Sequence, residues 1–247
     1  MSAHLASTLT WPKVKALAEA GAVALLPVGS TEAHGPHLPL SVDVVIAEEV
    51  CRRTAARLAA GGLPTVTFPA VAYGLTDFAG PFAGTVSLSA QVTSGLLEGV
   101  LADIARHGFT RVLAVNHHLE PAHFRVVKDA AARAAQATGA HIAAADHRKP
   151  PFGERLGEEF MRGGSHAGNY ETSLMLAAAP GLVDETERAA LPTLAVDLPA
   201  RIKAGAKNFL EAGGPLAYFG APADASAAEG ERLFGILVDA TLAALEP

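Results

Sequence analysis

Short apolar runs that alternate with longer amphipathic stretches constrain the fold most. Four runs are apolar, partly β-branched and bounded by Gly, Pro or polar residues, as buried strands are: Ala22–Val28, Thr65–Ala72, Arg111–Val115 and His141–Ala145. Four longer stretches repeat apolar residues at helical spacing: Val44–Leu58, Val92–Ala105, Pro121–Ala137 and Glu229–Leu245. Strands that alternate with helices form a parallel sheet covered on both faces. We therefore predict an α/β fold, a three-layer α/β/α sandwich with a mainly parallel central sheet.

The composition narrows the class of protein. The 247 residues suit one domain, residues 1–247, and 50% are hydrophobic, so a substantial core can form. No apolar run reaches the roughly 18 residues that a bilayer span needs, so we expect no membrane association. The net charge of -6 and the scattered basic residues argue against nucleic acid as a partner. Cys51 is the only cysteine and no secretory signal precedes the first run, so we expect a cytoplasmic protein.

Polar side chains follow each predicted strand. In open parallel sheets, ligands bind beyond the carboxyl ends of the strands. The residues at these positions, in strand order, are Glu32, His34 and Asp43; Tyr73 and Gly74; Asn116, His117, His118 and Glu120; and Asp146 and His147. The fold therefore predicts one polar edge that gathers most of the chemically active side chains.

The segment from Ser30 to Asp43 holds two imidazoles and two carboxylates. Imidazole nitrogen and carboxylate oxygen are the ligands of borderline and hard divalent cations. Glu32 and His34 can point the same way in an extended segment. Asp43 would begin the next helix, so capping of that helix is an equally open interpretation of its carboxylate.

Two further clusters have ligand-like spacing. His118 and Glu120 are two residues apart, and His166 and Glu171 flank Gly168 before an apolar run. The alternatives are histidines satisfied by core hydrogen bonds and a capped helix start. We interpret four other histidines, which lack a partner nearby in sequence, as surface or core residues: His4, His107, His123 and His141. Cys51 lies inside a predicted helix and no Gly-x-Ser-x-Gly elbow occurs, which leaves metal-activated water as the best-supported chemistry.

Five stretches resemble the creatininase (creatinine amidohydrolase) family. They are Pro27 to Pro39 followed by Asp43, Tyr73-Gly74 leading to Gly84–Leu88, Asn116 to His118, His166-Ala167-Gly168 followed by Glu171-Thr172-Ser173, and Tyr218 to Pro222. These motifs are specific and span most of the chain.

The resemblance implies a site for two divalent metal ions, zinc or manganese with iron as a further option. The implied ligands are Glu32, His34, Asp43, His118 and Glu120, with Asp43 bridging the ions. Glu171 is implied either as a further ligand or as a residue that orients one, whereas His37 lies outside the ligand set.

The implied reaction is attack of hydroxide on an amide carbonyl. The departing nitrogen needs a proton, for which Glu120, through a water, and His166 are the candidates. The resemblance places four further residues near the substrate or its loops: Thr76, Asn116, Leu119 and Ser165. It also implies a homo-oligomer, often a hexamer.

The sequence departs from creatininases proper around the substrate. Leu119 replaces an aromatic residue, Ser165 replaces an acidic one, and the single tryptophan is Trp11. We therefore expect an amidohydrolase acting on a small cyclic or linear amide other than creatinine. The alternatives are a relative that acts on a formamide, an oxidised inositol ring or a peptide, and a metal-binding protein without catalysis.

Overall fold

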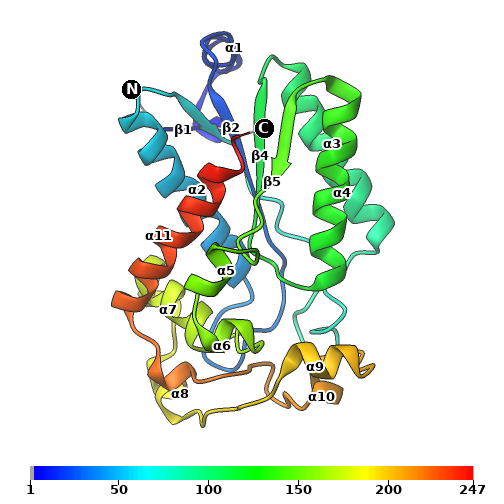
Figure 1. Cartoon of the computed structure of the whole chain (residues 1–247), viewed down its shortest axis with the longest axis vertical. Coiled ribbons are helices and arrows are strands. Elements are labelled where there is room, and N and C mark those ends of the chain that lie inside the picture. The colour runs from blue at the N-terminus through cyan, green and yellow to red at the C-terminus, as the bar shows by residue number, and fades with distance from the viewer. Residues whose placement is uncertain (1–2, 247) are drawn as a thin grey trace.

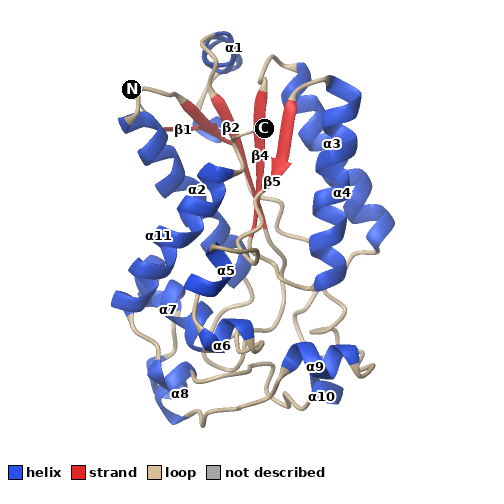
Figure 2. Cartoon of the chain, in the orientation of Figure 1, coloured by secondary structure: helices blue, strands red, loops and turns tan. Residues whose placement is uncertain are grey.

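The computed structural model describes residues 3–246 and confirms the predicted α/β fold. Within these residues all strand pairs of the central sheet are parallel, in the order β1-β3-β2-β4-β5. Figure 2 shows the strands in red, with β1, β2, β4 and β5 labelled. The strands are β1 (Ala3–Leu5), β2 (Val23–Val28), β3 (Thr65–Thr67), β4 (Arg111–Asn116) and β5 (His141–Ala144).

The second predicted strand is shorter than expected, and β1 was not predicted. β3 ends at Thr67 because Pro69 has no backbone N–H to donate to a ladder, and only an isolated bridge from Val71 to Val28 follows. β1 has three residues, too few for a periodic pattern, and it forms because it pairs with β3.

The side chains of β2 alternate between two cores. Val23 and Leu25 belong to one core, which includes residues of α2 (Val42–Ala60), α7 (Asn169–Ala178) and α11 (Ala227–Ala243). Ala24, Leu26 and Val28 belong to the other core, formed with α3 (Ala90–Arg106), α4 (Pro121–Thr138) and α1 (Trp11–Glu19). Figure 1 shows α2 and α11 on one side of the sheet and α3 and α4 on the other, so the three layers are as predicted.

Short helices and loops lie beyond the carboxyl ends of the strands, in the lower half of Figure 1. Phe209, Phe219 and Leu198 pack there in a third core. The helices of this region are α5 (Phe152–Arg155), α6 (Glu158–Met161), α8 (Glu185–Ala190), α9 (Leu198–Lys203) and α10 (Phe209–Ala212). Short 3₁₀ turns complete the chain: η1 (Ala6–Thr8), η2 (Pro180–Leu182) and η3 (Pro222–Asp224). No helix among residues 3–246 is long and apolar enough to cross a membrane.

Candidate functional site

Six side chains that are distant in sequence meet at the carboxyl edge of the sheet. Glu32 and His34 follow β2, Asp43 lies in the first turn of α2, and His118 follows β4. Glu171 lies in the first turn of α7, and His166 lies in the loop that precedes this helix. All six are buried, with His166 the most accessible at 8% exposure. The fold therefore brings together, at one edge of the parallel sheet, six side chains that are spread over about 140 residues of sequence.

Two groups of three potential ligands share the carboxylate of Asp43. In the first group, the Nδ1 atom of His118 lies 3.1 Å from Glu32 Oε1 and 3.1 Å from Asp43 Oδ2. In the second group, the Nε2 atom of His34 lies 3.4 Å from Asp43 Oδ1 and 3.4 Å from Glu171 Oε2. Each group offers one imidazole nitrogen and two carboxylates, a donor set typical of zinc or manganese.

The hydrogen bonds of the two histidines determine which ring nitrogen faces the carboxylates. His34 donates from Nδ1 to the carbonyl of Glu32 at 3.1 Å, and His118 donates from Nε2 to the carbonyl of Leu75 at 2.9 Å. When either ring is neutral, its nitrogen that faces the carboxylates carries a lone pair, and His34 Nε2 has no hydrogen-bond partner within residues 3–246. Lone pairs aimed at carboxylates repel them unless a cation lies between, so the geometry fits metal ligands.

The buried charges favour a cation. Among the described residues, only histidines form ion pairs with Glu32, Asp43 or Glu171; no lysine or arginine does. Burial alone would lower the pKa of His34, yet the charges of Glu171 and Asp43 raise it to about 10. This edge of the sheet therefore attracts positive charge strongly, whether protons or metal ions.

The capping interpretation of Asp43 is wrong. Ser41 occupies the N-cap position of α2, and its side chain makes no cap hydrogen bond. The Asp43 carboxylate instead accepts a hydrogen bond from the hydroxyl of Ser30 at 2.7 Å. Its oxygens therefore point back to the end of β2, toward the histidines.

The contacts of Glu171 fit both interpretations. Glu171 lies in the first turn of α7, and its Oε2 atom accepts the backbone N–H of Ala167, the residue before the N-cap Gly168, at 2.6 Å, much as a capping glutamate accepts the N–H of the N-cap residue. The same oxygen lies 3.4 Å from His34 Nε2. The cap hydrogen bond thus holds the carboxylate in position to act as a ligand.

Glu120 lies beside these clusters. It belongs to no group of three potential ligands within residues 3–246, and its Oε2 atom accepts the backbone N–H of Phe78 at 3.1 Å. It lines a cavity of about 60 Å³ whose walls also include Glu32, His118 and His166. Burial raises the pKa of Glu120 to about 7, which suits a proton donor near neutral pH.

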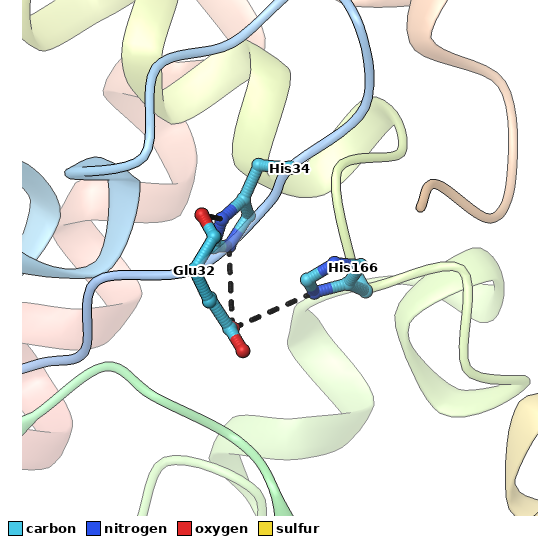
Figure 3. A group of neighbouring side chains, drawn as sticks. All are labelled: Glu32, His34 and His166. Carbon is cyan, nitrogen blue, oxygen red and sulfur yellow. Dashed lines mark hydrogen bonds and ion pairs between the residues drawn. The ribbon is translucent and has the colours of Figure 1, made fainter. Parts of the chain in front are cut away.

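His166 faces the same cavity with an uncharged ring. It donates from Nε2 to the carbonyl of Ala33 at 3.0 Å, which leaves Nδ1 as an acceptor 3.9 Å from Glu32 Oε1. Figure 3 shows Glu32 between His34 and His166. Burial and the charge of His34 lower the pKa of His166 to about 3, so it accepts hydrogen bonds more readily than it donates a proton.

The four remaining predicted positions have different roles. Thr76 donates its hydroxyl hydrogen to Glu32 Oε2. Asn116 accepts from the backbone N–H of His118 and donates to its carbonyl at 2.7 Å, so it orients a loop. Leu119 and Ser165 line the cavity. His37, which the family resemblance leaves outside the ligand set, hydrogen-bonds through Nε2 to the Thr172 hydroxyl at 2.9 Å.

Three supporting residues were given no role from the sequence. Ser30 orients Asp43, as described above, and His117 Nδ1 lies 3.9 Å from both Asp43 and Glu171. Glu159 in α6 accepts backbone N–H groups from Asn169 at 2.7 Å and from Ala221 at 3.0 Å, so it ties α6 to the segments that hold these two residues. Ser30 and His117 carried a signal in sequence, since Ser30 opens the acidic and histidine-rich segment and His117 follows a predicted strand, whereas Glu159 carried none.

His123, interpreted from sequence as a residue without a partner nearby, supports His118. It donates to Asn116 Oδ1 and accepts the backbone N–H of Leu75, whose carbonyl holds the His118 ring. A Cβ atom on Gly74 would lie 2.4 Å from the His123 ring. Glycine at this position therefore allows the close approach that fixes the ligand.

We predict that Gly74→Ala weakens zinc binding about 10- to 100-fold, because it displaces the residue that orients a ligand. Competition with a chromophoric chelator measures this affinity. Gly99→Ala is the matched control: a Cβ atom there meets nothing within 4 Å, so we expect unchanged zinc affinity. Equal affinity in the two variants would contradict the role given to His123.

Acid should destabilise the fold partly through His147. Burial and the charge of His117 lower the pKa of His147 to about 3, so the unfolded chain takes up a proton that the folded chain does not. Stability is then lost as pH falls below about 6.5, by up to about 1.4 kcal/mol per pH unit from this group. Urea unfolding at pH 7.5 and pH 5 should show a smaller loss for His147→Phe than for wild type. The exposed His107→Phe should behave as wild type does, and an equal loss in all three proteins would contradict the assignment.

A family model, curated relatives and a solved structure all match this chain. Residues 7–245 match the family model "Creatininase: Creatinine amidohydrolase". The chain is 34% identical to a creatinine amidohydrolase of Pseudomonas putida over 187 residues, covering 71% of this chain and 72% of that protein. It is also 34% identical to a mycofactocin precursor peptide peptidase of Mycobacterium tuberculosis (strain ATCC 25618 / H37Rv) over 233 residues, covering 87% and 81%. A solved structure described as creatininase with Mn superposes with a TM-score of 0.75 at 25% identity, over 100% of both chains.

Proposed function

The chain belongs to the creatininase family, and on that premise we propose that it is a metal-dependent hydrolase that cleaves a carbon–nitrogen bond of an amide. One observation carries this proposal. The buried lone-pair nitrogens of His34 and His118 face three carboxylates that no lysine or arginine of residues 3–246 neutralises. A site of this kind is costly to bury unless it binds cations.

We assign one ion to Glu32, Asp43 and His118, and the other to His34, Asp43 and Glu171. The described creatininase structure contains manganese, and the donor set suits zinc equally. Two such ions, when bound, lower the pKa of a shared water toward about 7 and polarise the carbonyl of an amide. In this assignment Glu171 takes the ligand place that the sequence analysis gave to Glu120.

The residues around the cavity would handle the proton and the substrate. Glu120, which is not among the assigned metal ligands, would protonate the departing nitrogen. Its pKa of about 7 keeps a fraction of the Glu120 carboxyl groups protonated near pH 7. His166 would accept a hydrogen bond from the substrate through Nδ1. Thr76 and Ser30 would hold Glu32 and Asp43 in place through their hydroxyls.

The substrate is an amide of either of two kinds. One relative is named for creatinine, a cyclic amide, and another is named as a peptidase of a precursor peptide. Trp11 is 77% exposed, so the only tryptophan does not cover the cavity in the described structure. Among residues 3–246 no tryptophan therefore encloses a creatinine-sized ligand, and we keep both a cyclic amide and a peptide amide as candidate substrates.

Metal removal tests the proposal. Dialysis against a chelator should abolish hydrolysis across a panel of creatinine, lactams, formamides and short peptides, and zinc or manganese should restore it. Full activity in the metal-free protein would overturn the proposal. Protein that holds two ions per chain without hydrolysing any amide would instead be a metal-binding protein without catalysis.

We also propose that the chain forms a homo-oligomer, because several large apolar side chains are exposed. Trp11 is 77% exposed, Val92 is 55% exposed and Tyr73 is 49% exposed. Light scattering coupled to gel filtration should give a mass that is a multiple of 25.3 kDa. A mass of one chain at micromolar concentration would contradict this.

A further inference from the structure

The metal-site cavity adjoins a second, larger groove. The inner cavity has a volume of about 60 Å³, and the outer groove has about 420 Å³. Both are lined by the same five residues, namely Leu119, Pro121, Ser165, Leu198 and Ile202. Because these side chains border both spaces, the groove is the nearest room for the part of a ligand that lies away from the metal ligands.

Two of the shared residues are departures from creatininases proper. Leu119 and Ser165 stand where those enzymes have an aromatic and an acidic side chain. In this chain both side chains are uncharged and border both spaces.

The outer groove is lined mostly by apolar side chains, together with two cationic ones. Met161 from α6 and Ile202 from α9 contribute apolar wall, and Met161 is 53% exposed. Arg148 and Lys203 line it as well, whereas no acidic side chain of residues 3–246 does. Exposed apolar surface next to the metal cavity indicates a place for an apolar group of a ligand.

Of the two cations that line the groove, Lys203 is the one without a negatively charged partner among the described residues. Arg148 already pairs with Asp146 at 3.0 Å, and its guanidinium lies 3.3 Å from the centre of the Phe124 ring. The Lys203 ammonium has no ion-pair or hydrogen-bond partner within the described residues. A free ammonium at the end of an apolar groove is complementary to an anionic group on an apolar ligand.

We propose that the groove binds the carboxylate-bearing part of the substrate, so that the preferred substrates are amides of apolar amino acids with a free α-carboxylate. The inference rests on the proposed function: the scissile amide lies at the metal ligands, the apolar side chain lies against Leu119 and Ile202, and the carboxylate pairs with Lys203. Such an end occurs in small N-acylamino acids and at the carboxyl terminus of a peptide, and both present the same chemistry to the groove.

Matched probes test the charge. We expect the zinc- or manganese-loaded protein to bind N-acetyl-L-phenylalanine more tightly than N-acetyl-L-phenylalaninol, which has the same apolar group and no carboxylate. Lys203→Glu should lower the ratio of the two affinities roughly two- to fivefold, the size of effect that a partly exposed ion pair has. Arg201→Glu is the control, since it makes the same charge change on α9 at a residue that does not line the groove, and should leave the ratio unchanged.

Binding and turnover separate the outcomes. Equal affinity for the two probes would overturn the inference, because the carboxylate would then contribute nothing to binding. A ratio that Lys203→Glu does not change would also overturn it, because the carboxylate would then be bound elsewhere, as by the metals. Isothermal titration calorimetry measures these affinities without turnover. A protein that binds the carboxylate probe more tightly yet hydrolyses no amide would contradict the proposed function and support the groove assignment. Hydrolysis of N-acetyl-L-phenylalanine compared with a peptide ending in phenylalanine then distinguishes the two sources.

Met161→Asp tests the apolar wall independently. The side chain is half exposed on a short helix, so the substitution should leave the fold intact. A carboxylate in the groove should weaken binding of N-acetyl-L-phenylalanine more than tenfold, since it removes apolar contact and repels the anion. Unchanged binding would exclude the groove as the site.

Discussion

Asp43→Asn should leave the protein with less than one divalent ion per chain and lower amide hydrolysis by on the order of a thousandfold or more. The carboxylate is the only member common to the two ligand groups, facing His118 at 3.1 Å through Oδ2 and His34 at 3.4 Å through Oδ1. Asparagine keeps the size but offers one neutral oxygen, so it cannot serve both ions. Elemental analysis of the purified variant and its kcat/KM measure the two effects.

A thermal-shift readout makes this test independent of the substrate. Ligands that bind only the folded state raise its melting temperature, so zinc or manganese should stabilise wild type strongly and Asp43→Asn little. Asp129→Asn makes the same chemical change on the exposed surface of α4 and should retain the wild-type response to metal. Two bound ions and undiminished turnover in Asp43→Asn would show that Asp43 does not bridge.

Glu120→Gln should retain both ions and lose about 10²- to 10⁴-fold in kcat, the size of effect that general acid catalysis supplies. Glutamine can still accept the Phe78 N–H but cannot release a proton. The variant should also lose the decline of the rate that deprotonation of Glu120 produces as pH rises through about 7. Rate profiles between pH 5 and 9, with metal content measured on the same samples, show both.

The same variant decides between the two roles considered for Glu120. If its metal content falls with its activity, Glu120 is a ligand, as the sequence analysis predicted, and the assignment of Glu171 must be revised. If metal content is unchanged, Glu120 acts on the substrate. Glu154→Gln, at an exposed position in α5, controls for the loss of a carboxylate elsewhere.

The fold was predictable where local pattern and tertiary environment agree. β2, β4 and β5 match the predicted runs to within a residue or so at each end, because a strand buried on both faces is apolar throughout. The four long helices likewise lie where the periodicity placed them. β1, α1 and the short helices α5, α6, α8, α9 and α10 were missed, and α7 was considered only as a possible capped helix start. The short ones hold few residues each, and they are stabilised by contacts such as Phe209 on Phe219 that no local window contains.

The site was predictable in its members and less so in its arrangement. Glu32, His34, Asp43 and His118 follow strands, so the sheet rule and the family motifs both pointed to them, and the structure brings them to one edge. The division of labour between Glu120 and Glu171 was left open. It depends on where α7 directs its first turn relative to β2, which is a long-range packing relation.

Sequence by itself determined the fold class, the family and the donor atoms of a metal site, because these depend on residue type and on spacing within single elements. Only the tertiary structure decided which nitrogen of each histidine faces the carboxylates, since distant carbonyls such as that of Leu75 select it. It also decided that Leu119 and Ser165 border both the metal cavity and the groove that Lys203 lines. The histidine tautomers, the grouping of the ligands and the groove all depend on contacts between segments far apart in the chain. Such contacts produce no periodic pattern of residues, so they cannot be predicted from the sequence.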